Sequence, residues 1–330
     1  MKIKKDKFKD ALASIAKEAK VFLPMKGVYA SEYRVWDGAG EPFFERNTAL
    51  PPKELLFPRS ERMYEYDLNA GTVTEAAPDE KIVIAGIRPC DVRSVEHLDK
   101  VFLESEYTDV YYRARRENLT MIAYGCATPA PTCFCDSMDV VPTDAPGADV
   151  VMNDAGNSYV LTVNTPKGEH IRDLISSFLS EGKADDVPAV SCSLKVEKPD
   201  DLHKQLIARF DDPMWETLSD ACLGCGCCSY ICPTCYCFDI GRENRGKTGT
   251  AFRCWDSCMF SDYSRMAGGH NPRPTKKERL RNRYLHKLAY FPERYGTSLC
   301  VGCGRCIDKC PARLDITNVP DIIQGSESNG

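Results

Sequence analysis

The sequence predicts an α+β protein of two folding units, an N-terminal α/β unit over residues 1–212 and a cysteine-rich unit over residues 213–330. Three observations lead to this expectation. The chain of 330 residues is long enough to form two units. Short apolar runs alternate with helical periodicity in its first 210 residues. Thirteen of the 18 cysteines lie from Cys222 onward, so the composition changes near residues 210–220.

Composition narrows the class of protein. With 43% hydrophobic and 28% charged residues the chain is typical of soluble globular proteins, and a net charge of -5 does not indicate a nucleic-acid partner. No apolar run approaches the roughly 20 residues that span a bilayer, and the basic start lacks the apolar core of a secretory signal. We therefore expect a cytoplasmic protein whose cysteines bind metal rather than form disulfides.

Local patterns define the first elements. Residues 6–23 carry apolar side chains at helical spacing, which predicts an amphipathic helix. The run KIVIAGI at 81–87 is typical of a buried strand, and the helical pattern after RPCD places Cys90 at a strand-to-helix turn. A second apolar run at 119–125 ends at Cys126, which predicts another strand.

Later segments lead into the cysteine-rich unit. Residues 158–165, SYVLTVNT, follow NDAGN and predict part of a hairpin. From residue 199 onward the pattern is helical, with Trp215 and Leu218 shortly before Cys222. A helix is therefore expected to lead the chain into the cysteines.

Two cysteine runs share the spacing C-x2-C-x2-C-x3-C-P. This is the bacterial two-cluster ferredoxin pattern, in which the first three thiolates of a run bind one [4Fe-4S] cluster and the fourth binds the other. Paired CxxC sequences also form Zn–S4 sites, but zinc requires neither the third CxxC step nor the Cys-Pro. The second unit is thus expected to be ferredoxin-like with two [4Fe-4S] clusters. Their ligands would be Cys222, Cys225, Cys228 and Cys310 for cluster 1, and Cys300, Cys303, Cys306 and Cys232 for cluster 2.

An insertion separates the two runs by 67 residues and holds more cysteines. We expect residues 234–299 to form a large helical insertion. Two close pairs of thiols there suggest a third metal site, with buried and inert cysteines as the alternative. The candidate ligands are Cys235, Cys237, Cys254 and Cys258.

The insertion is also basic, with thirteen Lys or Arg against five Asp or Glu between Arg242 and Arg294. This pattern indicates either a solvated helix face, or a cationic cover over anionic clusters or a docking face for an acidic partner.

Four cysteines of the N-terminal unit form a candidate fourth site, because the ends of neighbouring strands meet at one edge of a sheet. Ordinary buried cysteines, or one reactive thiol with its neighbours, are the alternatives. Cys192 stands alone in the sequence and is predicted to be a core residue. The candidate ligands are Cys90, Cys126, Cys133 and Cys135.

The sequence contains no motif that indicates nucleotide binding or nucleophilic catalysis. Neither G-x-G-x-x-G after a strand nor G-x-x-x-x-G-K-[ST] occurs, so no nucleotide site is predicted. The five histidines lack metal-ligand spacing, and no nucleophile with a base is evident. We predict no catalytic residue.

Several motifs resemble one known family. CPTCYCFDI, WDSC, AGGHNPR and CVGCGRC, preceded by RPCD, YYRARREN and CFCDSM, are similar to those of iron–sulfur electron-transfer subunits. That family includes the β subunit of cytoplasmic sulfhydrogenases and the corresponding iron–sulfur subunit of anaerobic sulfite reductase. Cys235, Cys237 and Cys258 match its pattern, whereas Cys227 and Cys254 depart from it and Cys227 receives no role.

The resemblance implies a relay. In that family the subunit passes electrons between a flavoprotein subunit, which binds FAD and NAD(P)H, and a catalytic subunit with a [NiFe] or sirohaem centre. The same two partners are implied here. Two other hypotheses stay open, a stand-alone iron–sulfur enzyme with a substrate site near Cys90, Asp91 and Cys126, and a zinc-stabilised interaction protein.

Overall fold

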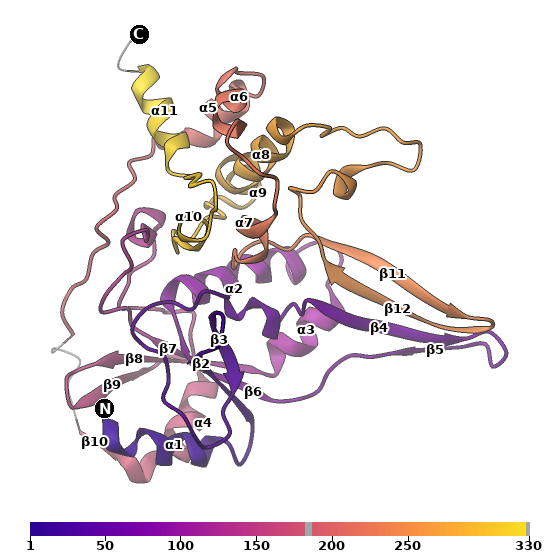
Figure 1. The fold of residues 1–330 in the computed structure, drawn as a ribbon. Coiled ribbons are helices and arrows are strands. Elements are labelled where there is room, and N and C mark those ends of the chain that lie inside the picture. The colour runs from indigo at the N-terminus through magenta and orange to yellow at the C-terminus, as the bar shows by residue number, and fades with distance from the viewer. Residues whose placement is uncertain (182–186, 328–330) are drawn as a thin grey trace. The chain divides into compact units, whose positions relative to one another are not determined.

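The computed structural model describes residues 1–181 and 187–327, which divide into two compact units (Figure 1). A single division after residue 212 was expected, but the units interleave along the chain. Unit 1 consists of Met1–Leu56, Ala77–Ser193 and Val301–Cys303, and unit 2 of Phe57–Ala76, Leu194–Cys300 and Gly304–Gly330.

Unit 1 is built on an eight-stranded mixed sheet with the order β10-β1-β9-β8-β7-β6-β2-β3. The central strands β8, β7, β6 and β2 are parallel, and the outer strands pair antiparallel. The predicted strands at 81–87 and 119–125 and the predicted hairpin are confirmed. The strands are β1 (Lys2–Lys4), β2 (Lys20–Lys26), β3 (Ser31–Val35), β6 (Ile82–Ile87), β7 (Leu119–Tyr124), β8 (Val150–Asp154), β9 (Ser158–Val163) and β10 (Leu179–Ser180).

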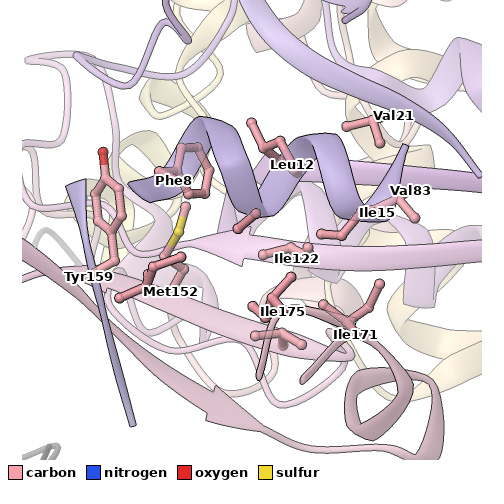
Figure 2. Close-up of a cluster of buried hydrophobic side chains, with 14 of the residues drawn as sticks. Phe8, Leu12, Ile15, Val21, Val83, Ile122, Met152, Tyr159, Ile171 and Ile175 are labelled. Carbon is pink, nitrogen blue, oxygen red and sulfur yellow. The ribbon is translucent and has the colours of Figure 1, made fainter. Parts of the chain in front are cut away.

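Helices cover both faces of this sheet. Helices α1 (Phe8–Ile15) and α4 (Pro166–Leu174) pack on one face and bury Leu12 and Ile171 in the main core (Figure 2). Helices α2 (Pro89–Phe102) and α3 (Val110–Glu117) connect β6 to β7. This connection moves along the sheet in the direction opposite to that of α1, which leads from β1 to β2. Right-handed crossovers therefore place α2 and α3 on the opposite face.

The helix predicted over residues 6–23 is wrong in its second half. α1 ends at Ile15, and β2 begins at Lys20 and pairs in parallel with β6. Val21 and Leu23 are buried in the sheet. Their contacts across strands outweigh a helical pattern that is present only locally.

Unit 2 contains a four-stranded antiparallel sheet with the order β11-β12-β4-β5. Its two hairpins come from distant parts of the chain. They are joined at their base, where the indole Nε1 of Trp255 donates to the carbonyl of Phe57 at 2.9 Å and a buried ion pair links Arg253 and Glu61. The strands are β4 (Ser60–Asp67), β5 (Thr72–Glu75), β11 (Phe238–Arg245) and β12 (Thr248–Trp255).

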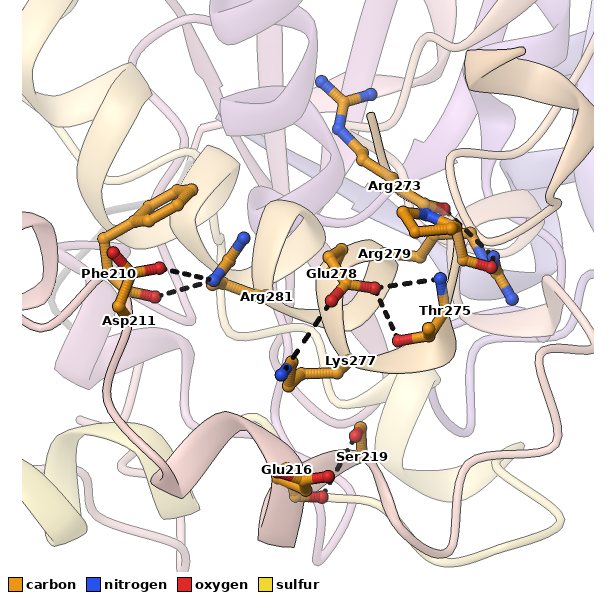
Figure 3. Close-up of polar contacts among 11 residues, drawn as sticks. Phe210, Asp211, Glu216, Ser219, Arg273, Thr275, Lys277, Glu278, Arg279 and Arg281 are labelled. Carbon is orange, nitrogen blue, oxygen red and sulfur yellow. Dashed lines mark hydrogen bonds and ion pairs between the residues drawn. The ribbon is translucent and has the colours of Figure 1, made fainter. Parts of the chain in front are cut away.

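Helices form the rest of unit 2, so the insertion is helical only after its hairpin. The helical approach to Cys222 is confirmed by α5 and α6. Helix α8 begins at a capping box in which Thr275 and Glu278 satisfy each other's polar groups (Figure 3). The helices are α5 (Leu202–Ala208), α6 (Met214–Ser219), α7 (Cys227–Tyr230), α8 (Lys276–Leu285), the π-helical turn η7 (His286–Tyr290), α9 (Phe291–Tyr295), α10 (Arg305–Asp308) and α11 (Asn318–Glu327).

Short 3₁₀ turns complete the regular structure. They are η1 (Lys5–Lys7), η2 (Pro52–Leu55), η3 (Cys135–Met138), η4 (Ser176–Phe178) and η6 (Asp262–Ser264). Within the described ranges, no helix combines the length and the apolar character that crossing a membrane requires.

Candidate metal centres

The two cysteine runs fold into matching loops. In each, a glycine with a left-handed backbone precedes a one-turn helix: Gly226 (φ 73°) leads into α7, and Gly304 (φ 71°) leads into α10. Only glycine adopts this conformation without strain. The repeat in the sequence is therefore a repeat in backbone shape, and it turns each loop back on its own cysteines.

The four ligands predicted for cluster 1 line one pocket of unit 2. Apolar side chains, including Met259 and Leu314, form its walls. Backbone N–H groups point at the sulfurs, with Gly224 N at 3.4 Å from Cys222 Sγ and Leu314 N at 3.3 Å from Cys310 Sγ. The cysteines of this pocket are Cys222, Cys225, Cys227, Cys228, Cys306 and Cys310.

A buried arginine completes this pocket. Arg283 of α8 is 2% exposed, and its Nε donates to Cys228 Sγ at 3.1 Å while Nη2 donates to the Cys228 carbonyl at 2.8 Å. Its Nη1 is buried and has no hydrogen-bond partner among the described residues. Burial alone would lower the pKa of Arg283, but the thiolates of Cys228 and Cys235 raise it well above its usual value. A [4Fe-4S] cluster fits this pocket, because it needs thiolate ligands and accepts hydrogen bonds at its sulfurs.

A second buried cation, Lys287 of η7, lies near Cys232 and Cys235. Its Nζ donates to Thr234 Oγ1 at 2.9 Å, and the hydroxyl of Thr234 lies 3.3 Å from Cys232 Sγ. Lys287 can only donate, so the Thr234 hydroxyl is free to donate to the sulfur of Cys232. Burial alone would lower the pKa of Lys287, but the thiolates of Cys232 and Cys235 raise it well above its usual value.

Three of the four cysteines predicted for the third site come together near this lysine. A hydrogen bond from Cys258 lowers the pKa of Cys237 to about 6, and Cys235 interacts electrostatically with Cys258. Cys235 is also hydrogen-bonded to Cys232, a residue predicted for cluster 2. Cys254 lies at the end of β12 opposite Asp239, and both Cys254 and Cys237 interact electrostatically with Tyr230.

The members predicted for cluster 2 fall in both units. Cys300, Cys306 and Cys232 belong to unit 2, whereas Cys303 belongs to the short segment Val301–Cys303 of unit 1. There the carbonyl of Cys303 accepts from Asn47 Nδ2 at 2.8 Å. Unit 1 therefore holds Cys303 in place, and unit 2 holds the other three cysteines.

The cysteines predicted for the fourth site gather in unit 1. Cys90, Cys133 and Cys135 are buried in one cluster, and Cys126 interacts electrostatically with Cys133 and Cys135. Cys192 is buried as predicted, but its sulfur lies 3.5 Å from Cys135 Sγ, so it is part of the thiol cluster. The contact between Cys192 and Cys135 could not be predicted from cysteine spacing, because 57 residues separate the two.

The basic stretch of the insertion serves several purposes. Arg281 donates to the Phe210 carbonyl at 2.8 Å and lies over the Phe210 ring, and Arg279 donates to the carbonyls of Arg273 and Pro274 (Figure 3). Arg283 and Lys287 are instead buried among thiols. The alternative of a cationic cover thus applies to these two residues.

Within the described part of the chain, no three or more His, Cys, Asp or Glu side chains converge tightly enough to hold a single metal ion. An iron–sulfur cluster spreads its ligands round a cube and requires no such convergence.

Comparison with known proteins agrees with these features. Residues 221–314 match the family described as a 4Fe-4S dicluster domain. Over 288 residues the chain is 33% identical to the sulfhydrogenase 2 subunit beta of Pyrococcus furiosus, with 84% of each chain covered. No solved structure matches significantly.

Proposed function

The chain belongs to the family of iron–sulfur electron-transfer subunits that includes the sulfhydrogenase 2 β subunit, and we propose that it relays single electrons between two partners in an oxidoreductase complex. One partner would be a flavoprotein subunit that binds FAD and NAD(P)H. The other would be a catalytic subunit, such as a hydrogenase or a sulfite reductase. We place this complex in the cytoplasm. The relative is named as a subunit of a sulfhydrogenase, which supports assignment to a complex.

The pocket around Cys222 is the main observation that supports this proposal. Its cysteines supply thiolates, its backbone N–H groups and Arg283 donate to sulfur, and its apolar walls exclude water. When bound, a [4Fe-4S] cluster supplies reversible storage of one electron. The buried positive charge of Arg283 would offset the negative charge of a cluster bound to these cysteines.

The cysteine spacing supports the ligand assignments. We propose that one cluster is held by the first three cysteines of the first run with the last of the second, and the other by the reciprocal set. A third site would use Cys235, Cys237 and Cys258, with Cys254 or Cys232 as its fourth ligand. The contact between Cys232 and Cys235 favours Cys232, whereas the ferredoxin pattern assigns Cys232 to cluster 2.

Two neighbouring cysteines allow a direct test. Cys222 and Cys227 line the same pocket, but only Cys222 belongs to the ferredoxin pattern. Iron and acid-labile sulfide are measured on the full chain purified without oxygen. The unaltered chain is expected to hold at least about eight irons. Cys222→Ser is expected to lose about four of them, and Cys227→Ser none. Stoichiometric zinc without iron would refute the iron–sulfur assignment.

The relay role needs a separate measurement. NAD(P)H is expected to bleach the visible absorbance of the chain only when a flavoprotein subunit of the complex is present. The competing hypothesis of a stand-alone enzyme predicts substrate turnover by the isolated chain. Such turnover without any partner would overturn the relay while leaving the cluster assignment intact.

A further inference from the structure

Five cysteines of unit 1 meet at the carboxyl edge of its parallel strands. Cys90 follows β6 at the start of α2, and Cys126 follows β7. Cys133 and Cys135 lie in the loop between β7 and β8, and Cys192 reaches the same place from beyond β10. Ligand sites of open α/β sheets lie at this edge, because neighbouring loops converge there.

Hydrogen bonds hold this cluster in place. Asp136 Oδ2 accepts from the backbone N–H of Cys192 at 2.9 Å and from the hydroxyl of Ser191 at 3.2 Å. Cys192 Sγ is thereby held 3.5 Å from Cys135 Sγ. The segment that carries Cys192 is thus attached directly beside η3, which starts at Cys135.

The sulfurs of this cluster accept hydrogen bonds from backbone N–H groups, as the sulfurs in the pocket of unit 2 do. The backbone N–H of Thr128 donates to the sulfur of Cys126, and that of Ala130 donates to the sulfur of Cys133. The buried guanidinium of Arg88 interacts electrostatically with Cys126. Such donors suit the sulfur ligands of a cluster, which accept hydrogen bonds, whereas inert cysteines packed as apolar side chains need none.

Cys192 has the strongest claim to complete a set of four. It is buried in one cluster with Cys133 and Cys135, Asp136 holds its backbone N–H, and its Sγ lies 3.5 Å from Cys135 Sγ. Cys90 packs in the same buried cluster together with Val140 and Val301. We propose that Cys126, Cys133, Cys135 and Cys192 hold an iron–sulfur cluster in unit 1, with Cys90 in the wall of the site.

The chemistry of the donors selects the cofactor. Four thiolates with no imidazole or carboxylate among them suit iron–sulfur clusters or zinc. The chain belongs to an iron–sulfur family. Iron–sulfur clusters are therefore expected to be available to these cysteines while the chain assembles. Binding releases the thiol protons and joins four sulfurs to iron, without any oxidation of the protein.

The location links this site to the second ferredoxin run. Cys133 Sγ lies 3.6 Å from the carbonyl oxygen of Cys303, and Phe134 N donates to the Gly302 carbonyl at 2.9 Å. A cluster held by Cys133 would therefore lie next to a proposed ligand of another cluster. The inference goes beyond the relay, because it requires only that unit 1 binds iron and sulfide.

The test compares two cysteines of the same buried cluster. Iron, sulfide and zinc are measured on the full chain, purified anaerobically, for Cys192→Ala and for the matched control Cys90→Ala. Cys192→Ala is expected to lose about four irons and four sulfides per chain, and Cys90→Ala none. EPR of the reduced protein reports whether the clusters of the dicluster domain persist, which checks folding. Should Cys192→Ala fail to accumulate, Cys126→Ser replaces a less buried ligand and is expected to show the same loss.

Four results would overturn the inference. Full iron in Cys192→Ala, or in Cys126→Ser where that variant stands in, would show that the site holds no cluster through that cysteine. Loss of iron in Cys90→Ala but not in Cys192→Ala would assign the fourth ligand to Cys90. Loss of one zinc in place of iron would make the site a zinc site. A disulfide between Cys135 and Cys192, found by mass spectrometry of the protein as purified, would make the pair a redox thiol pair.

Discussion

Unit 1 and unit 2 both gather thiols, but they surround them differently. In unit 2 the buried cations Arg283 and Lys287 lie among the cysteines, and the pKa of Cys237 is lowered to about 6 by its hydrogen bond from Cys258. In unit 1 burial raises the pKa of Cys133 to about 12. Two buried cations thus lie among the thiols of unit 2, whereas the thiols of unit 1 are surrounded mainly by packed side chains, two backbone donors and Arg88.

This difference indicates how each group responds to loss of its cofactor. Without a cluster, Arg283 keeps its hydrogen bonds to the sulfur and the carbonyl of Cys228. In unit 1 burial raises the pKa values of Cys126, Cys133 and Cys135, so without a cluster these three thiols favour their neutral form. The two units therefore depend on different interactions, and four pairs of substitutions test this.

Removal of the buried cation should have the largest effect. Arg283→Met removes the hydrogen bonds that the buried guanidinium donates to the sulfur and the carbonyl of Cys228, and we expect unit 2 to lose about 3–5 kcal/mol of stability, at roughly 1.5–3 kcal/mol for each bond from a charged group. The control on the same helix is Arg281→Met, which removes one carbonyl contact, an ion pair with the exposed Asp211 and a cation–π contact, and should cost roughly 1 kcal/mol. Anaerobic denaturant unfolding measures both. Equal midpoints for the two variants would show that charge does not hold unit 2.

The next largest loss of stability is expected from a substitution that disturbs close backbone packing in unit 1. A Cβ at Gly302 would lie 2.5 Å from the Cα of Cys135, and its backbone is left-handed at φ 62°. We expect Gly302→Ala to cost about 3 kcal/mol, from backbone strain of roughly 1–2 kcal/mol and displacement of the Cys135 segment.

The matched control has the same backbone without the contact. Gly246 has φ 66° and nothing within 4 Å of an added Cβ. Gly246→Ala should therefore cost about 1 kcal/mol, the strain alone. Thermal unfolding compares the two variants, and equal losses would contradict the packing argument for unit 1.

Attachment of the Cys192 segment gives a smaller effect. Asp136→Ala leaves the buried N–H of Cys192 without its acceptor and should cost about 1–3 kcal/mol. Ser191→Ala removes the longer hydroxyl contacts, to Asp136 Oδ2 and to the Cys192 carbonyl, and should cost about 0.5 kcal/mol. Alkylation of Cys192 in metal-free protein, followed by mass spectrometry, should be faster in Asp136→Ala. An unchanged rate would show that Asp136 does not fix the segment.

The smallest effect is expected at the start of α8, far from any change in thiol charge. Thr275→Ala removes the cap and should cost about 1 kcal/mol. Partial burial alone would raise the pKa of Glu278, but hydrogen bonds from the hydroxyl and the N–H of Thr275 lower it below its usual value. The folded state thus favours the carboxylate, so this contribution is present above the usual pKa and is lost as pH falls below it. Unfolding of Glu278→Gln should lack this dependence on pH, and an unchanged dependence would contradict it.

Local patterns predicted much of the secondary structure. Strands β6 and β7 and helix α2 were predicted because continuous apolar runs and helical spacing need only near neighbours. The helix over residues 6–23 extended too far, because burial of Val21 in the sheet depends on β6, a strand distant in the sequence. The hairpin of the insertion was missed for a different reason: β11 and β12 pair locally, but β11 reads FDIGRENR and is largely exposed, so no apolar run marks it.

Cysteine spacing was sufficient to identify the two ferredoxin-type runs and the iron–sulfur family, because those cysteines are neighbours along the chain and their spacing fixes how they wrap a cluster. The contact of Cys192 with Cys135, and the burial of Arg283 and Lys287 among thiols, became visible only in the folded chain. The same is true of the place of Cys303 in unit 1. These contacts join residues far apart in the sequence, so they depend on how strands and helices pack and leave no periodic signal.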